Sequence, residues 1–439
     1  MDTVPIGGLT ELFEWTEEKF DASHTTPLRN YRATNGPELL LCHDMKGGYL
    51  DEERWNGYAV PEDSQPYILL NYWSVDIFCY FSHNFITIPP AAYINLGHAN
   101  GCLVLGTFIT EWTGGYALCS QIFDSTEHCD AAIDVLVRIS KHYKFDGWLI
   151  NIENKCQPEW IPNICYFLRQ LTDRTRSTSP IGATRVIWYD SVLENGRLHW
   201  QNQLNTLNKC FYDHCDGIYL NYNWSESELL DSADFGEINK IYAGIDVFAR
   251  GCIGGFDCNK SLCKIEFLRM STALFAPGWI AEKFSSLDQI HMGLKFWDHL
   301  SNLMHRRPIL ELPFETDFRA GFSRKGDQKW FCLRSISPQP QFVSTSIHPL
   351  PEGGLMIREP GEHKLFLLDC DVVSGLVISL RSSSPISVLV NGSALPPSSR
   401  SEYRLNGPVH LKSLDIITNQ PKTIIFNVIV KSLTSESTA

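Results

Sequence analysis

An asparagine and a glutamate stand two residues apart in the apolar stretch Phe145-Asp-Gly-Trp-Leu-Ile-Asn-Ile-Glu-Asn154. Side chains alternate between the two faces of a β-strand, so Leu149, Asn151 and Glu153 share one face. The rise per residue separates Asn151 and Glu153 by about 6.5–7 Å, a distance that can span one sugar ring. Burying an acid beside an amide is costly without a use. This pair therefore predicts a site that binds a polar group.

The segments that must position this pair alternate between two types. Short apolar runs recur at intervals of about 20–40 residues, and several are separated by residues of helical period, as in 131–143 and 161–171. We expect strands at Leu39–Asp44, Asp76–Phe81, Cys102–Phe108, Gly147–Glu153, Arg185–Asp190, Gly217–Asn223, Ile241–Phe248 and Ala273–Pro277. Eight strands alternating with helices over about 250 residues predict a (β/α)8 TIM barrel. A doubly wound open sheet is the alternative, but no Gly-rich phosphate turn follows the first strand.

The carboxyl ends of the predicted strands carry polar and aromatic residues, and active sites of such barrels lie at these ends. Aromatic rings stack on the CH faces of sugars, whereas carboxylates and amides bind hydroxyl groups. The composition of this rim therefore predicts a carbohydrate cleft. Besides Asn151, Glu153 and Tyr189, the candidate substrate-binding residues are His43, Glu111, Trp112, Trp200, Asn223, Trp224, Asp246 and Trp279.

Each candidate also has a structural explanation. Glu153 could be an acid that pairs with a basic neighbour, and Asn151 could be a satisfied core amide. Tyr189 could close the barrel core, and Trp200 and Trp224 could be packing residues. Structural or helix-capping roles are also open for three rim residues and for one further acid: His43, Glu111, Asp246 and Asp44.

The composition bounds the class of protein. The 439 residues carry a formal net charge of −13, which argues against nucleic acid or an anionic membrane as the main partner. The amino terminus lacks a signal-peptide pattern, and no apolar run of about 18 residues is present, so we expect a cytoplasmic protein. Reduced thiols are then the expectation for the 14 cysteines. We expect no metal and no cofactor, and the sequence indicates no particular partner protein.

The character of the chain changes near residue 310. Prolines become frequent, and short alternating runs such as Leu376–Leu380, Ile386–Val390 and Thr423–Val430 are separated by turn residues. This pattern predicts an antiparallel β-sandwich. We therefore expect a catalytic barrel over 1–310, an accessory β-sandwich over 311–433, and a disordered tail over 434–439.

The stretch around Asn151 and Glu153 resembles the catalytic strand of the endo-β-N-acetylglucosaminidases of glycoside hydrolase family 85. The resemblance covers about residues 5–320, and cytosolic eukaryotic members are the nearest likeness. Seven further segments agree in the family's order: His43-Asp-Met-Lys-Gly-Gly-Tyr49, Gly106-Thr-Phe-Ile-Thr-Glu-Trp112, Trp188-Tyr-Asp-Ser191, Trp200-Gln-Asn202, Asn221-Tyr-Asn-Trp224, Gly244-Ile-Asp-Val-Phe248 and Phe275-Ala-Pro-Gly-Trp279.

The resemblance implies a reaction and roles for its residues. Family members cut the β-1,4 bond between the two core N-acetylglucosamines of N-glycans, with retention, and the substrate's own acetamido oxygen forms an oxazoline. Glu153 matches the general acid/base, and Asn151 matches the residue that holds the acetamido N–H. Tyr189 matches a tyrosine that contacts the acetamido group, and Trp200 and Trp224 match aromatics of the cleft. Transfer of the sugar to other acceptors is a second outcome in this family.

The sequence leaves other functions open. A lectin on the same barrel could bind sugars without turnover, and the β-sandwich could serve a protein scaffold. A chitinase with another acceptor preference is a near neighbour in chemistry. The expected substrate is an N-glycan, a glycoprotein or a free oligosaccharide.

Overall fold

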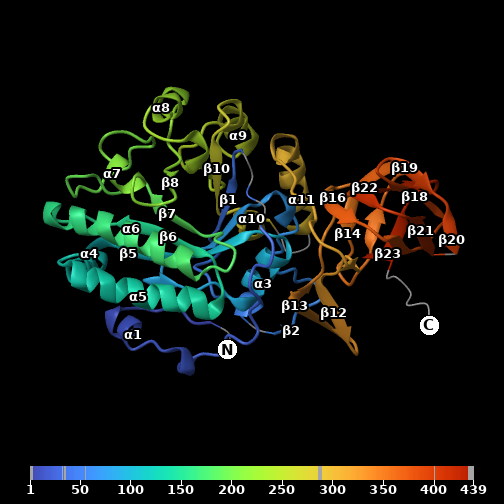
Figure 1. Ribbon diagram of the computed structural model, residues 1–439, viewed down its shortest axis with the longest axis horizontal. Coiled ribbons are helices and arrows are strands. Elements are labelled where there is room, and N and C mark those ends of the chain that lie inside the picture. Colours follow the sequence, from blue (N-terminus) through green and yellow to red (C-terminus); the bar gives the residue numbers. More distant parts are fainter. Residues whose placement is uncertain are drawn as a thin grey trace. The chain divides into compact units, whose positions relative to one another are not determined.

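The computed structural model describes residues 3–31, 33, 36–54, 56–284, 289–399 and 401–433. The chain divides into two compact units (Figure 1). The first unit comprises residues 1–55 and 75–283, and the second comprises residues 56–74 and 284–439. The predicted boundary at residue 310 stays a prediction, and the predicted disordered tail 434–439 lies outside the described residues.

Eight parallel strands form the first unit's closed barrel, which confirms the predicted TIM-barrel fold. Neighbouring strands pair in chain order, and the ring closes because β1 pairs with both β3 and β10. The strands are β1 (Leu39–His43), β3 (Ile77–Tyr80), β5 (Leu103–Glu111), β6 (Gly147–Glu153), β7 (Arg185–Tyr189), β8 (Gly217–Leu220), β9 (Ile241–Asp246) and β10 (Ser271–Phe275). All eight predicted strands are present, and only their ends differ. A short strand, β4 (Ile86–Thr87), pairs antiparallel with β5.

Helices follow the barrel strands, and the two longest, α5 and α6, lie side by side (Figure 1). The Ser125 side chain caps α5 by accepting the His128 N–H, and Lys144 ends it in a left-handed conformation. The helices of this unit are α1 (Leu9–Phe13), α2 (Asp51–Arg54), α3 (Ala91–Ala99), α4 (Trp112–Ile122), α5 (Thr126–Tyr143), α6 (Ile161–Thr178), α7 (Lys209–Tyr212), α8 (Glu226–Ser232), α9 (Cys258–Phe267) and α10 (Trp279–Lys283).

Side chains along β6 alternate between the inside of the barrel and its outer face, and each side packs against different neighbours. Leu149 belongs to the cluster inside the barrel, together with Tyr189 and Tyr219 from the next strands. Trp148 is fully buried on the other face, where its ring lies 5.0 Å from that of Phe145. The inward face of β6 is therefore the face that Asn151 and Glu153 share with Leu149.

Antiparallel sheets dominate the second unit, as predicted. A seven-stranded sheet and a four-stranded sheet contribute to one core, which includes Leu376, Ile378, Leu414 and Val428. The first sheet contains β11 (Phe314–Thr316), β14 (Ile347–Pro349), β15 (Leu355–Ile357), β17 (Gly375–Ser382), β20 (Pro397–Ser399), β21 (Glu402–Asn406) and β23 (Thr423–Ser432). The second contains β16 (Gly361–Val372), β18 (Ile386–Val390), β19 (Ser393–Leu395) and β22 (Val409–Thr418).

Two smaller elements complete the second unit. The strands β2 (Tyr58–Ala59), β12 (Ala320–Lys325) and β13 (Gln328–Ile336) form a three-stranded sheet, and α11 spans Gln289–Leu300.

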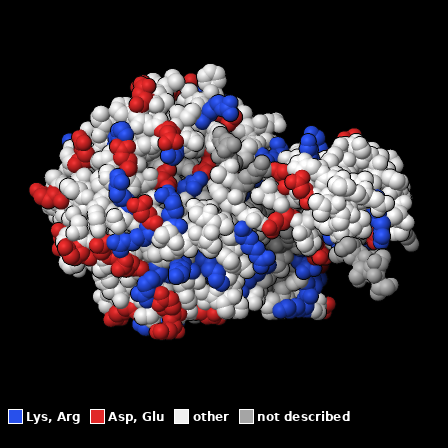
Figure 2. Space-filling view, viewed as in Figure 1, with Lys and Arg blue, Asp and Glu red and all other residues white. Residues whose placement is uncertain are grey.

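Acidic and basic side chains are interspersed on the face of the molecule in Figure 2. Within the described part of the chain, no helix has both the length and the apolar character needed to cross a membrane.

Candidate active site

The start of strand β6 is fixed by two residues of the Phe-Asp-Gly-Trp motif. The Asp146 carboxylate accepts the Val104 N–H at 2.8 Å and contacts His98 Nε2 at 2.8 Å. Gly147 has a φ of 143°, and a Cβ there would lie 1.9 Å from the Arg185 carbonyl oxygen. Only glycine tolerates both the conformation and this approach of β7. The motif thus sets β6 between its neighbours and brings Asn151 and Glu153 to the barrel mouth.

Asn151 and Glu153 form a pair on the inward face of β6. The Asn151 amide lies close enough to the Glu153 carboxyl to lower its pKa. Asn151 is only 4% exposed, and its Oδ1 atom has no hydrogen-bond partner among the described residues. Because buried polar atoms are normally hydrogen-bonded, this oxygen offers a buried acceptor to a ligand.

Glu153 holds its proton more tightly than a free glutamic acid. Burial raises the pKa of Glu153, and the charge of Glu111 raises it further, whereas His83, the Asn151 amide and Arg250 lower it. A general acid needs a raised pKa to keep its proton near neutral pH. The surroundings of Glu153 supply this condition through desolvation and a like charge.

Glu111 is positioned beside Glu153 at the end of strand β5. The two residues are direct partners in the parallel register of β5 and β6. A Glu111 oxygen lies 3.0 Å from His83 Nδ1, and this hydrogen bond raises the pKa of His83. The negative charge of Glu111 therefore lies close enough to Glu153 to raise the pKa of Glu153. Its predicted contact with substrate stays a prediction.

Tyr189 ends strand β7 and belongs to a chain of polar contacts. Its hydroxyl donates to Asn221 Oδ1 at 3.1 Å, and Asn221 Nδ2 donates to Asn202 Oδ1 at 2.7 Å. The Asn202 N–H then donates to Asp190 Oδ2 at 2.7 Å. Burial of Asp190 raises its pKa to about 6. These contacts fix the Tyr189 hydroxyl and give positioning roles to residues that we did not include among the candidates.

Three tryptophans lie where their rings are at least partly exposed. Trp112 begins α4 directly after β5 and is 76% exposed, and Trp200 lies in the loop after β7 with 39% exposed. Trp279 begins α10 after β10, and its ring lies 4.7 Å from that of Phe248. All three follow the carboxyl ends of barrel strands, as predicted. Their stacking on sugars stays a prediction.

Two of the predicted rim residues, His43 and Asp246, are buried against other protein groups. His43 is 1% exposed, with Nε2 at 2.9 Å from Glu53, and Asp246 is fully buried and bonded to Arg250 Nε at 2.7 Å. Their polar groups contact protein partners because α2 and the loop after β9 fold back over them. Their predicted contact with substrate stays a prediction.

The residues after strand β8 divide between the surface and the barrel wall. Trp224 is 3% exposed, and its Nε1 donates to the Gly244 carbonyl at 2.7 Å. The structure thus gives Trp224 a packing role, and its contact with a sugar stays a prediction. Asn223 is exposed, and its amide oxygen packs against Gly251, where a Cβ would approach it to 2.0 Å.

Arg250 is a site residue that the sequence prediction missed. Its guanidinium lies 5.5 Å from the centre of the Tyr222 ring and 4.8 Å from that of Phe248. Its charge lowers the pKa of Glu153, and Asp246 holds the side chain in place. Asp246 ends β9, and Arg250 follows four residues later. This spacing was the sequence signal that could have indicated the Asp246–Arg250 pair.

The family model for glycosyl hydrolase family 85 matches residues 49–326, which contain β6 and its site. The chain belongs to glycosyl hydrolase family 85. It is 42% identical to a cytosolic endo-beta-N-acetylglucosaminidase of Gallus gallus over 72% of this chain and 44% of the relative. It is 39% identical to the Homo sapiens protein of that name, over 77% of this chain and 47% of the relative. The chain thus spans about half the length of these curated relatives.

A solved structure of the Endo-D glycoside hydrolase domain from Streptococcus pneumoniae R6 has the same fold. The superposition gives a TM-score of 0.75 at 14% identity and covers 99% of this chain and 84% of that chain. At this identity the likeness shows the fold alone. The family 85 barrel of this chain thus contains an acid with a raised pKa, a buried amide oxygen and a tyrosine hydroxyl held by a hydrogen bond.

Proposed function

We propose that this chain is an endo-β-N-acetylglucosaminidase that hydrolyses the β-1,4 bond between the two core N-acetylglucosamines. Its substrates are N-glycans on glycoproteins or free oligosaccharides. The reaction retains anomeric configuration and passes through an oxazoline that the substrate forms itself. Relatives from Gallus gallus and Homo sapiens are named cytosolic endo-beta-N-acetylglucosaminidases, which supports the proposed class of enzyme.

The observation that carries the proposal is the buried Asn151 Oδ1 atom without a partner, next to Glu153. An unsatisfied buried acceptor costs about 1–3 kcal/mol, so its retention at a barrel mouth calls for a donor from outside the protein. The N–H of a 2-acetamido group is such a donor. Accepting that N–H turns the acetamido carbonyl oxygen toward the anomeric carbon.

The first step forms one bond and breaks another. The acetamido oxygen attacks the anomeric carbon while Glu153 gives its proton to the departing glycosidic oxygen, and the bond to that oxygen breaks. Asn151 accepts the acetamido N–H, and the Tyr189 hydroxyl contacts the same group. The acetamido nitrogen keeps its proton in this step, so the ring forms as the protonated oxazoline, and the Glu153 carboxylate balances its positive charge.

The second step regenerates the acid. Glu153, now a carboxylate, takes a proton from water while the water oxygen attacks the anomeric carbon and opens the oxazoline. The product keeps the original anomeric configuration because two inversions occur at one carbon. A sugar hydroxyl that replaces the water gives transglycosylation.

The cellular location that fits this chain is the cytosol. All 14 cysteines are free thiols, which suits a reducing compartment. Relatives from chicken and human are named cytosolic. A location in the cytosol suits glycans released from glycoproteins as substrates.

Mass spectrometry of the products of a defined N-glycopeptide tests the proposal. We expect one N-acetylglucosamine to stay on asparagine, and Glu153→Gln to lower the rate by roughly 100-fold or more. Glu194→Gln is the matched control, since Glu194 is exposed in the loop after β7. Binding of the glycopeptide by the wild type without turnover would instead identify a lectin.

A further inference from the structure

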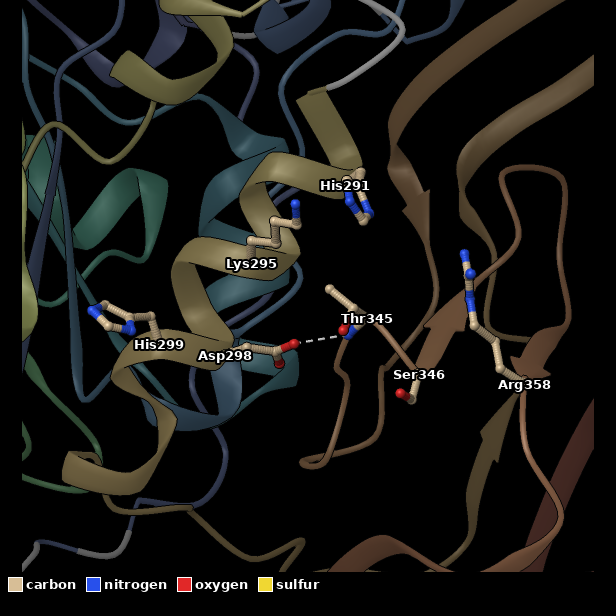
Figure 3. A pocket seen from close by; sticks show the side chains of 7 residues that line it. All are labelled: His291, Lys295, Asp298, His299, Thr345, Ser346 and Arg358. Carbon is tan, nitrogen blue, oxygen red and sulfur yellow. Dashed lines mark hydrogen bonds between the residues drawn. The ribbon is translucent and has the colours of Figure 1, made fainter.

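The second unit contains a pocket of about 540 Å³ between α11 and the β14–β15 hairpin (Figure 3). Its volume far exceeds that of one water molecule, about 30 Å³. All of its lining residues belong to this one unit. They are His291, Lys295, Asp298, His299, Thr345, Ser346 and Arg358.

The first wall is one face of helix α11. His291, Lys295, Asp298 and His299 follow one another at the spacings that place residues on the same side of a helix. Another side of the helix is buried and includes Leu294, which packs in a small apolar cluster with Leu70, Ala320 and Val343. This packing leaves the polar face of α11 to line the pocket.

The second wall of the pocket is the β14–β15 hairpin with the residues next to it, and a hydrogen bond connects it to α11. Asp298 Oδ2 accepts the Thr345 N–H at 2.9 Å, which joins the helix to the segment before β14 (Figure 3). The hairpin register pairs Ile347 with Ile357, and the Arg358 N–H donates to the Ser346 carbonyl at 3.1 Å. Arg358 and Ser346 therefore lie next to each other opposite the helix.

The pocket carries two cations that the described residues leave without an acidic partner. Lys295 and Arg358 are both exposed and face each other across the pocket, one from each wall (Figure 3). Asp298 brings one negative charge, but its carboxylate already accepts the Thr345 N–H. Burial, then the charges of Arg358 and His291, lower the pKa of the neighbouring His348.

We propose that this pocket binds a phosphate monoester. A phosphate monoester carries about −1.5 to −2 charge at pH 7 and has three acceptor oxygens. Lys295 supplies a point charge and Arg358 a fork of N–H donors, while the Thr345 and Ser346 hydroxyls supply further donors. A carboxylate has one charge and two oxygens, so Arg358 alone would satisfy it.

Binding measurements on the full chain test the pocket directly. Calorimetry at fixed ionic strength would compare inorganic phosphate, mannose 6-phosphate and N-acetylneuraminate. Lys295→Met and Arg358→Met keep much of each side chain's apolar stem but remove its charge. Lys412→Met removes an exposed charge elsewhere in the same unit and serves as the control. Thermal unfolding of each variant verifies that the fold is kept.

The expected result is saturable binding of a phosphate probe that each pocket variant weakens at least 10-fold and the control leaves unchanged. Tighter binding of mannose 6-phosphate than of inorganic phosphate would identify a sugar-borne phosphate as the source. Equal binding would identify free phosphate. The proposal is overturned if neither phosphate probe binds, if the pocket variants bind as the wild type does, or if N-acetylneuraminate binds more tightly than both.

Discussion

Glu111 lies directly opposite Glu153 where the parallel strands β5 and β6 end together. The negative charge of Glu111 adds to the burial that raises the pKa of Glu153. His83 forms a hydrogen bond with Glu111, and its positive charge, when it is protonated, lowers the pKa of Glu153. The proton affinity of the proposed acid is therefore set by neighbours that do not need to touch the substrate.

Replacing Glu111 is expected to move the pH profile of hydrolysis. Cleavage needs protonated Glu153, so activity falls as the pH rises through the pKa of Glu153. Glu111→Gln removes a charge that raises this pKa, and the alkaline limb of kcat/KM should move to lower pH. His83→Gln removes a charge that lowers it and should move the limb to higher pH. Unchanged limbs in both variants would show that neither residue tunes Glu153.

Removing Arg250 should combine a shift in pH profile with a loss of stability. Its charge lowers the pKa of Glu153, so Arg250→Met should move the alkaline limb to higher pH. The same change removes a hydrogen bond from the buried Asp246 carboxylate, at a cost of about 1–3 kcal/mol in unfolding free energy. Denaturant unfolding of this variant, with exposed Arg197→Met as the control, measures the second effect. Equal stability of the two variants would contradict it.

Gly147 should be intolerant of any side chain. A Cβ at this position meets the Arg185 carbonyl oxygen at 1.9 Å, and the backbone φ of 143° adds strain. We expect Gly147→Ala to lower the unfolding free energy by about 2–4 kcal/mol. Gly114→Ala is the matched control, because it lies in helix α4 with no atom within 4 Å of its Cβ, and should be neutral or slightly stabilising. Thermal melts that rank the two variants the other way would refute this account of the motif.

The barrel could be predicted from the sequence because its strands are short buried runs with regular spacing. Strand Gly147–Glu153 was predicted to the residue, and the alternation along it placed Asn151 and Glu153 on one face with Leu149. That inference needs only the period of two within a strand. Strand ends were less certain, because loops such as the one after β8 continue the strand-like alternation beyond Leu220, with Asn221 and Asn223 alternating with Tyr222 and Trp224.

The buried pairs of the rim could not be predicted from residue types at strand ends. His43 meets Glu53 only because helix α2 returns to β1 after ten residues, and Asp246 meets Arg250 through a turn. Strand β2 pairs with β13, which lies more than 250 residues away in the sequence. Such contacts depend on the path of loops, and a single sequence contains no periodic signal for them.

The central claim is that Asn151 orients an acetamido group so that the sugar breaks its own linkage. Asn151→Gln shifts the amide by one methylene, so it should disturb oxazoline formation but still permit attack on an oxazoline already formed. The most direct test compares two rates for this variant: hydrolysis of an intact N-glycan and transfer from a preformed glycan oxazoline to an acceptor. We predict that hydrolysis falls by roughly 100-fold or more while transfer stays within about tenfold of the wild type. Equal loss of both rates, or hydrolysis at the wild-type rate, would contradict the account.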